Sequence, residues 1–231
     1  MDFERFYDDY WQSKGDEQDD SKLELVASKV GAGKSVLEVG GHIGLLAKKI
    51  KDRGANVTLT DISEVALKRA RERGISNTVH IDIDKKPLPF DDESFDTVVS
   101  NSAIEHVFYP IKTIKECARV LKTGGKFILL VPNIAHWRFR LWLLAGRFPY
   151  KKNTPTDELH IRFFTLSEAK RMCKKEGLET ICVDGNTGLW SKDLYPWVIR
   201  LKYIRLLYRI LVRRLPSIFA RDIILVFRKK R

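Results

Sequence analysis

Short apolar segments alternate with helical patterns over the first 131 residues, and this alternation most constrains the fold. The elements expected in this part are strands over 35–39, 56–60, 79–83, 95–100 and 126–131, and helices over 22–30, 45–53, 63–73 and 111–121. Two of the helices end at Gly54 and Gly74, as is common for helix C-termini. Strands that alternate with helices over short links are typical of a parallel sheet covered on both faces.

The second part of the chain follows a different pattern. Residues 133–164 are aromatic and basic with no obvious strand, and a helix is expected over 165–176. Strands are expected over 179–183 and 222–228, paired as a terminal antiparallel β-hairpin with a long connection. The expected fold class is therefore α/β, with a seven-stranded, mostly parallel sheet and helices on both faces.

The chain is expected to form an N-terminal arm and one domain. The arm comprises residues 1–20, which are rich in acidic and aromatic side chains, and Ser21 is expected to cap the next helix with Glu24 as its capping-box partner. Residues 21–231 form the domain. Its expected substrate-side insertions are at about 133–164 and 185–220.

Positive charge is concentrated at one end of the sequence. The formal net charge is +12, yet residues 1–131 contain 20 basic and 22 acidic side chains, whereas residues 132–231 contain 22 basic and 8 acidic ones. An excess of this kind favours nucleic acid or an anionic membrane as a partner. It is an addition to a nearly neutral first part.

Composition excludes several classes of protein. The three cysteines form neither a disulfide framework nor a C-x-x-C metal pair, and the acidic, aromatic start does not resemble a signal peptide. The five histidines are scattered without the spacing of metal ligands, so no metal is expected. A reduced, cytoplasmic setting is expected.

A glycine-rich turn follows the first expected strand and indicates a cofactor. The sequence from Glu38 to Gly44 would bring helix N–H groups to a ligand, and Asp61 ends the second strand, where an acid commonly binds ribose hydroxyls. The dinucleotide fingerprint fails because His42 and Leu45 replace two of its glycines. A nucleoside-containing cofactor of another kind is indicated.

These segments resemble the class I S-adenosylmethionine (SAM)-dependent methyltransferases. The resemblance covers about 34–131, with 159–183 and 222–229 as the expected tail. It includes the acid-x-Gly-x-Gly-x-Gly turn apart from His42, the run LPFD…SFD before strand four, IEHV after it and VLKTGG before strand five. It implies a Rossmann-like fold and SAM as the cofactor. The residues that it implies for cofactor binding are Glu38, Gly40, Gly41, His42, Gly44, Asp61, Ile62, Asp82, Ile83 and Asn101.

Two details refine this resemblance. Residues 132–150 and the segment HIRFFT at 160–165 are similar to the MetW-like branch. His42 stands where the family has a glycine, so Gly41 is expected to take up the awkward dihedral angle. The His42 ring is then either a surface group at the turn or a contact to the SAM carboxylate. Weakened SAM binding in a non-catalytic protein is a third reading.

The resemblance implies displacement at a sulfonium methyl, for which the protein aligns the reactants. An oxygen nucleophile usually needs a base, and His160 is the candidate, with His106 and His136 as weaker ones. Glu38 either orients the turn or reaches the cofactor ammonium through water. Tyr7 and Trp11 are four residues apart and form either a lid over the cofactor or an ordinary aromatic packing contact.

Residues 197–215 (WVIRLKYIRLLYRILVRRL) contain six basic residues and no acid. Lys202, Arg205, Arg209 and Arg213 are expected to share one helix face, with most apolar side chains elsewhere. Three interpretations stay open: a helix packed on the domain, contact with a membrane or lipid-linked substrate, and a nucleic-acid surface.

The hypothesis drawn from the sequence is a SAM-dependent methyltransferase for a small-molecule, glycan or lipid-linked acceptor. The alternative is a non-catalytic or regulatory partner protein on the same fold. The expected location is cytoplasmic with peripheral membrane contact through 197–215, and nucleic acid is not the expected partner. The sequence predicts neither the acceptor atom nor the oligomeric state.

Overall fold

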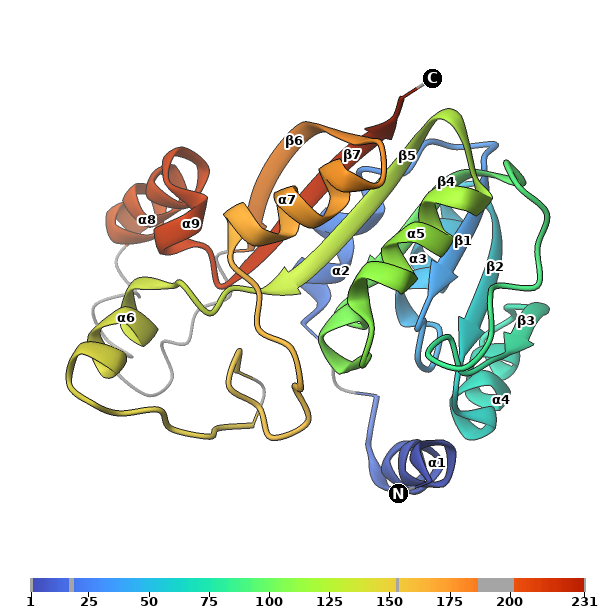
Figure 1. Ribbon diagram of the computed structural model, residues 1–231, viewed down its shortest axis with the longest axis horizontal. Helices are drawn as coiled ribbons and strands as arrows, with labels where there is room; N and C mark the ends of the chain where they lie inside the picture. Colours follow the sequence, from blue (N-terminus) through green and yellow to red (C-terminus); the bar gives the residue numbers. More distant parts are fainter. Residues whose placement is uncertain (1, 17–18, 153, 187–201, 231) are drawn as a thin grey trace.

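The computed structural model describes residues 2–16, 19–152, 154–186 and 202–230, which form one seven-stranded sheet (Figure 1). The strands are β1 (Ser35–Val39), β2 (Asn56–Asp61), β3 (Asn77–His80), β4 (Phe95–Asn101), β5 (Leu121–Pro132), β6 (Leu178–Asn186) and β7 (Asp222–Lys229). Their order is β3-β2-β1-β4-β5-β7-β6. Strands β1 to β5 are parallel, and β7 runs antiparallel to both β5 and β6, which confirms the expected hairpin.

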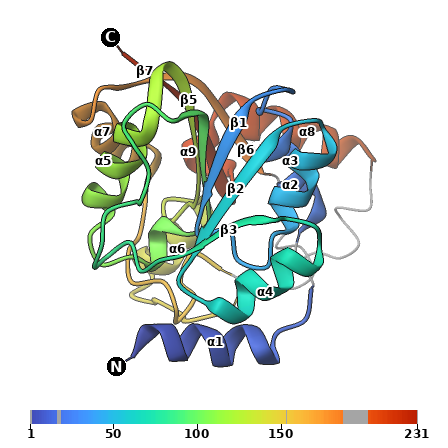
Figure 2. The same cartoon turned by 90° about the vertical axis from the view of Figure 1, so that its right-hand side faces the viewer.

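Helices cover both faces of the sheet, as expected (Figure 2). The described helices are α1 (Phe3–Ser13), α2 (Asp20–Ala27), α3 (Leu45–Asp52), α4 (Glu64–Glu72), the 3₁₀ helix η1 (Ile104–His106), α5 (Pro110–Val120), α6 (Trp137–Leu144), α7 (Leu166–Lys175), α8 (Lys202–Arg214) and α9 (Pro216–Phe219). Helices α5 and α7 lie on one face, and α2 and α3 on the other. Helix α1 lies across the edge of the sheet where the parallel strands end.

The sheet separates two buried clusters of apolar side chains. Leu37 and Phe127 belong to the cluster under α5 and α7, whereas Val36 and Ile128, their neighbours in the chain, belong to the cluster under α2 and α3. Successive residues of a strand point to opposite faces, so a strand covered on both sides needs apolar residues throughout. This is why the continuous apolar runs of the sequence identified the central strands.

Several expected boundaries are wrong. Asp19 rather than Ser21 caps α2, since its carboxylate accepts a hydrogen bond from the Lys22 N–H at 3.3 Å. Strand β3 covers Asn77–His80 instead of 79–83, because it pairs in parallel with Thr58–Asp61 of β2. Helices α1 and α6 were not expected from their sequences. Residues 197–201 of the basic segment lie outside the described residues, and α8 forms from Lys202 onward.

The topology brings distant segments to one edge of the sheet. The carboxyl ends of β1, β2 and β4 meet there, as they must in parallel strands. Since β7 is antiparallel, its first residue, Asp222, lies beside Pro132, the last residue of β5. Within the described part of the chain, no helix is long and apolar enough to cross a membrane.

Candidate active site

A cavity of about 780 Å³ lies at the carboxyl ends of the parallel strands. Its walls come from α1 and α2, the turn after β1, the ends of β2 and β4, η1, the loop over 154–160, and Arg221–Asp222. Sites for small molecules typically have volumes of ~300–1,000 Å³ and occur at this edge of open α/β sheets. One cavity therefore includes both the expected cofactor side and the expected acceptor side.

The glycine turn is built on left-handed backbone at three alternate positions. The φ angles are 64° at Gly40, 53° at His42 and 75° at Gly44. The expectation that Gly41 takes up the awkward dihedral is wrong, because His42 itself adopts the left-handed conformation. Gly41 is required for space instead: a Cβ there would lie 2.5 Å from Leu59 Cγ.

Asp61 holds this turn from the end of β2. Its carboxylate accepts hydrogen bonds from the backbone N–H groups of His42 at 2.8 Å and Ser63 at 2.9 Å. Burial raises the pKa of Asp61 to about 6 despite these hydrogen bonds. The carboxylate lines the cavity, where it could accept further hydrogen bonds from ribose hydroxyls.

The His42 ring is half-buried and packs against Trp11 of α1, with ring centroids 5.1 Å apart. Burial lowers the pKa of His42 to about 3, so its imidazole is neutral at physiological pH. The ring is thus held under α1 rather than free at the surface. A contact to the SAM carboxylate stays a prediction.

Glu38 supports the turn from behind. From the segment Glu38–Gly44, the cavity lining includes Val39, Gly40 and His42, but not Glu38, Gly41 or Gly44. Burial, and then the Asp61 carboxylate, raise the pKa of Glu38 to about 8, and the Ala47 N–H in the first turn of α3 hydrogen-bonds to it. The buried Glu38 side chain therefore lies behind the turn and beside the start of α3, whose N-cap residue is Gly44.

The remaining cofactor residues predicted from the sequence line the same wall: Ile62, Asp82, Ile83 and Asn101. Asp82 Oδ1 accepts the Asp84 N–H at 3.1 Å, and its other oxygen lies 2.9 Å from Lys85 Nζ. Buried Asn101 Oδ1 and Ser100 Oγ have no hydrogen-bond partner among the described residues. Buried polar atoms without a hydrogen-bond partner need one, and a polar, nucleoside-containing ligand such as SAM could supply it at this strand end.

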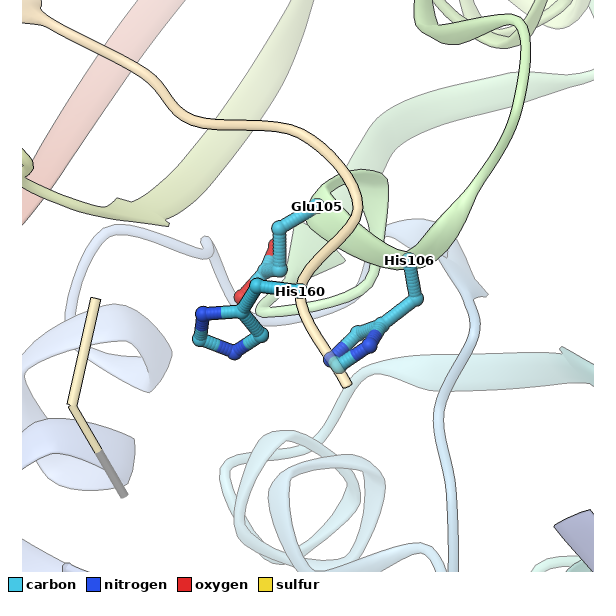
Figure 3. Close-up of side chains that lie close together, drawn as sticks. All are labelled: Glu105, His106 and His160. Carbon is cyan, nitrogen blue, oxygen red and sulfur yellow. The ribbon is translucent and has the colours of Figure 1, made fainter. Parts of the chain in front are cut away.

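Three side chains converge on the acceptor side of the cavity (Figure 3). Glu105 and His106 come from η1, and His160 comes from the loop before α7. His106 Nδ1 lies 3.0 Å from the Leu159 carbonyl oxygen, and His160 Nδ1 lies 3.1 Å from that of Pro155. Because a carbonyl oxygen only accepts, each Nδ1 carries the proton and each Nε2 has a free lone pair.

Burial sets the protonation of this cluster. It raises the pKa of Glu105 to about 8, lowers that of His106 to about 4, and lowers that of His160 below its usual value. Both Glu105 oxygens are buried, and neither has a hydrogen-bond partner in the described part of the structure. At neutral pH the cluster thus presents neutral imidazoles beside a carboxyl group that favours its protonated form.

The same three residues could in principle hold a cation, although no metal was expected from the sequence. One ligand atom from each lies within 4.8 Å of the others. Ligands of one zinc ion at ~2.1 Å would be only ~3.4 Å apart. The three residues are thus close enough to be tested as ligands of a divalent cation.

Comparison with known proteins agrees with this geometry. Residues 37–129 match the family described as a methyltransferase domain. The chain is 35% identical to a ubiquinone biosynthesis O-methyltransferase of Idiomarina loihiensis, over 66% of this chain and 65% of that protein. It is 32% identical to a protein of the same name from Azoarcus sp., over 68% of this chain and 69% of that one. The chain belongs to the class I SAM-dependent methyltransferases.

A solved structure supports the fold independently. The crystal structure of a SAM-dependent methyltransferase, possibly a histamine N-methyltransferase, from Thermotoga maritima matches with a TM-score of 0.65. It is 20% identical and covers 99% of this chain and 98% of its own. The likeness to the MetW-like branch stays a prediction.

Sequence reasoning missed several residues that line this methyltransferase's cavity. Lys22 of α2 donates to Ser102 Oγ at 3.0 Å, and Arg221 and Asp222 enter at the start of β7. The antiparallel hairpin was expected, and it implies that β7 begins at the carboxyl edge, so this signal was available. His136 is not among the lining residues, since its Nε2 lies 3.1 Å from Tyr208 Oη.

Helix α1 closes the cofactor side of the methyltransferase. Tyr7, Tyr10 and Trp11 line the cavity, and Asp8 accepts hydrogen bonds from Ser63 Oγ and the Val65 N–H. Arg69 of α4 donates to the Trp11 carbonyl oxygen at 2.6 Å. The aromatic residues of the arm therefore lie where a lid would, and a lid function stays a prediction.

Proposed function

We propose that this protein transfers the methyl group of SAM to a hydroxyl oxygen of a small-molecule acceptor, which includes glycan or lipid-linked alcohols and phenols. The observation that carries the proposal is His160, which presents a free Nε2 beside Glu105 in the cavity that also contains Asp61. The relatives named O-methyltransferases support methylation at oxygen.

The residues divide the task between them. When bound, SAM supplies an electrophilic methyl group, so the protein must mainly orient the acceptor and take its proton. Asp61, the glycine turn and Asn101 would hold the cofactor. His160 Nε2 accepts the proton of the acceptor hydroxyl, and the protonated Glu105 carboxyl donates a hydrogen bond that positions the acceptor oxygen.

The test is methyl transfer from SAM carrying a labelled methyl group to a panel of phenols, catechols, sugar alcohols and, for comparison, amines. We expect labelled O-methyl products, and a rate reduced ~100-fold or more in His160→Asn with SAM affinity retained, as for loss of a general base. His136→Asn is the matched control, because His136 does not line the cavity.

Three outcomes would contradict the proposal. Products labelled only at nitrogen would assign a different acceptor class. SAM binding without transfer to any acceptor, in the panel or in fractionated cell extract, would favour the non-catalytic partner protein instead. Activity abolished by a metal chelator and restored by a divalent cation would assign His160 to metal binding rather than to base catalysis.

A further inference from the structure

Helices α6 and α8 lie toward the same end of the molecule, away from β1, β2 and β3 (Figure 1). His136, the N-cap of α6, has its Nε2 3.1 Å from Tyr208 Oη of α8, and that hydroxyl donates to the Phe219 carbonyl oxygen at 2.9 Å. Asn133 Nδ2 donates to the carbonyl oxygens of Ser217 at 3.1 Å and Ala220 at 2.9 Å. Through these hydrogen bonds, α8 and the segment that leads into α6 are both attached to α9 and to Ala220, the residue that follows it.

Both helices expose large apolar side chains. The exposed fraction is 84% for both Leu144 and Tyr203. Among the side chains that the structure describes, the other exposed apolar ones on the two helices are Leu141, Leu143, Leu206, Leu207 and Ile210. In α3 and α7, by contrast, the leucine, isoleucine and methionine side chains are mostly turned into the core. In α8, the exposed Tyr203, Leu206, Leu207 and Ile210 follow helical spacing and so share one face, and an exposed apolar face of this kind marks a surface that meets a partner.

The two helices and the segments next to them are basic. Residues 133–152 and 202–221 contain five and six Lys or Arg residues, respectively, and no Asp or Glu. The exposed arginines are Arg140, Arg147, Arg209, Arg213 and Arg214. We call these arginines and the seven exposed apolar side chains the α6–α8 surface. Exposed leucines on helices that also expose arginines and contain no acids complement the apolar interior and anionic headgroups of a phospholipid bilayer.

The α6–α8 surface is connected to the acceptor side of the cavity. The loop that follows α6 contributes Thr154, Pro155 and His160 to the cavity lining, and Arg221, just after α9, lines it as well. A molecule anchored in the bilayer at this end of the protein would therefore reach the cavity from the side of His160 rather than from that of Asp61.

We infer that the α6–α8 surface docks on anionic phospholipid membranes and that the acceptor is a membrane-resident amphiphile. The docking itself requires neither SAM nor turnover, whereas the acceptor class rests on the proposed function. Membrane binding is expected to weaken with salt, since each basic residue near an anionic surface contributes ~1 kcal/mol that is screened within a Debye length.

The test is co-sedimentation of the full chain with phosphatidylcholine vesicles, with and without ~30% phosphatidylglycerol, at low and physiological salt. We expect binding to the anionic vesicles only, reduced at higher salt. The double variant Leu144→Glu/Leu206→Glu should lower the bound fraction at least tenfold. The matched control is Ile111→Glu/Ile181→Glu, which changes side chains that are 46% and 42% exposed on α5 and β6 and should bind as the wild type does. Unchanged SAM binding checks that each variant folds.

Five results would overturn the inference. The first four are no binding to anionic vesicles, equal binding to neutral vesicles, binding unaffected by Leu144→Glu/Leu206→Glu, and retention by RNA or DNA but not by vesicles. A lipid-free oligomer that the same double variant dissociates, without vesicle binding, would make a second copy the occupant. Because vesicle binding is measured without an acceptor, it can fail or succeed independently of methyl transfer.

Discussion

The two sides of the cavity are built from different kinds of structure. The cofactor side consists of the ends of β1, β2 and β4, where the sheet register fixes Gly40, Asp61 and Asn101 relative to one another. The acceptor side consists of η1 and a loop, next to helices that lie beyond the sheet. Strand ends fix the geometry of the cofactor side, because the sheet register holds them in place. The helix η1 and the loop can vary to suit a different acceptor without disturbing the sheet.

Charge follows the same division. The first 131 residues, which include the cofactor side, are nearly neutral, whereas the last hundred contain the basic excess. The two sides are joined at Glu105, whose carbonyl oxygen accepts hydrogen bonds from the N–H groups of Ile161 and Arg162, each at 3.0 Å. This contact places the loop that contains His160 against η1.

The largest expected effect concerns the pH dependence of stability, which can be compared for one buried glutamate from each side of the cavity. Burial raises the pKa of both Glu38 and Glu105 from 4.5 to about 8, so the folded state binds protons that the unfolded state releases. Their contribution to stability is present below pH ~4.5 and is lost as the pH rises toward 8, by up to ~1.4 kcal/mol per pH unit for each group.

We therefore expect the unfolding free energy, measured by urea denaturation, to fall between pH 7 and 8, and Glu105→Gln and Glu38→Gln each to flatten this decline. Below pH ~6.5 the buried histidines, whose pKa is lowered, act in the opposite direction. The exposed Glu179→Gln is the control and should leave the profile unchanged. Profiles of both variants that run parallel to that of the wild type between pH 7 and 8 would mean that both carboxylates are ionised in the folded protein.

Substitution of two glycines with similar φ angles can compare the turn at the cofactor side with an ordinary turn elsewhere in the protein. Gly40 and Gly124 have φ of 64° and 76°, but a Cβ at Gly40 would lie 2.5 Å from Ala103 Cβ, whereas at Gly124 it would meet nothing within 4 Å. Gly124→Ala should cost only the backbone strain of ~1–2 kcal/mol. Gly40→Ala should cost a further ~1–3 kcal/mol in urea denaturation and weaken SAM binding. Equal losses would contradict the tight packing of the turn.

The pH dependence of SAM binding should report on the cofactor side alone. Because the pKa of Asp61 is about 6 and its carboxylate is the expected ribose acceptor, SAM affinity should fall as the pH drops below 6, by up to tenfold per unit. Calorimetry between pH 5 and 8 measures this effect. The dependence should disappear in Asp61→Asn, and its persistence there would assign it to another group.

The smallest expected effect concerns the cover formed by α1. Trp11→Ala removes the ring that packs on His42 and should weaken SAM binding about three- to tenfold, mainly through faster dissociation. Stopped-flow displacement measures the rate, with the exposed Arg5→Ala as a control on the same helix. An unchanged dissociation rate in Trp11→Ala would contradict a lid function for α1.

Much of the cofactor side could be predicted from the sequence, because strand ends and a glycine turn are local patterns that the sheet then brings together. Asp61 and Asn101 line the cavity for this reason. The cluster of Glu105, His106 and His160 depends on a contact between residues more than fifty positions apart, which periodicity does not encode.

The unexpected helices have physical reasons too. Helix α6 (WRFRLWLL) is apolar on most sides, so its sequence shows no amphipathic pattern. Helix α1 combines acidic and aromatic residues, and tertiary contacts with α4, such as that from Arg69 to the Trp11 carbonyl oxygen, hold it in place. Such contacts cannot be read from local propensity.

The most direct test of the two-sided site is SAM titration calorimetry on four proteins. Wild type should bind one SAM, Asp61→Asn should bind it about 10- to 100-fold more weakly through the loss of charge-assisted hydrogen bonds, and His160→Asn should bind as wild type does. Asp96→Asn is the matched control, since Asp96 binds the Ser35 N–H at the opposite edge of the sheet. An absence of SAM binding to the wild type, or unchanged affinity in Asp61→Asn, would contradict the account.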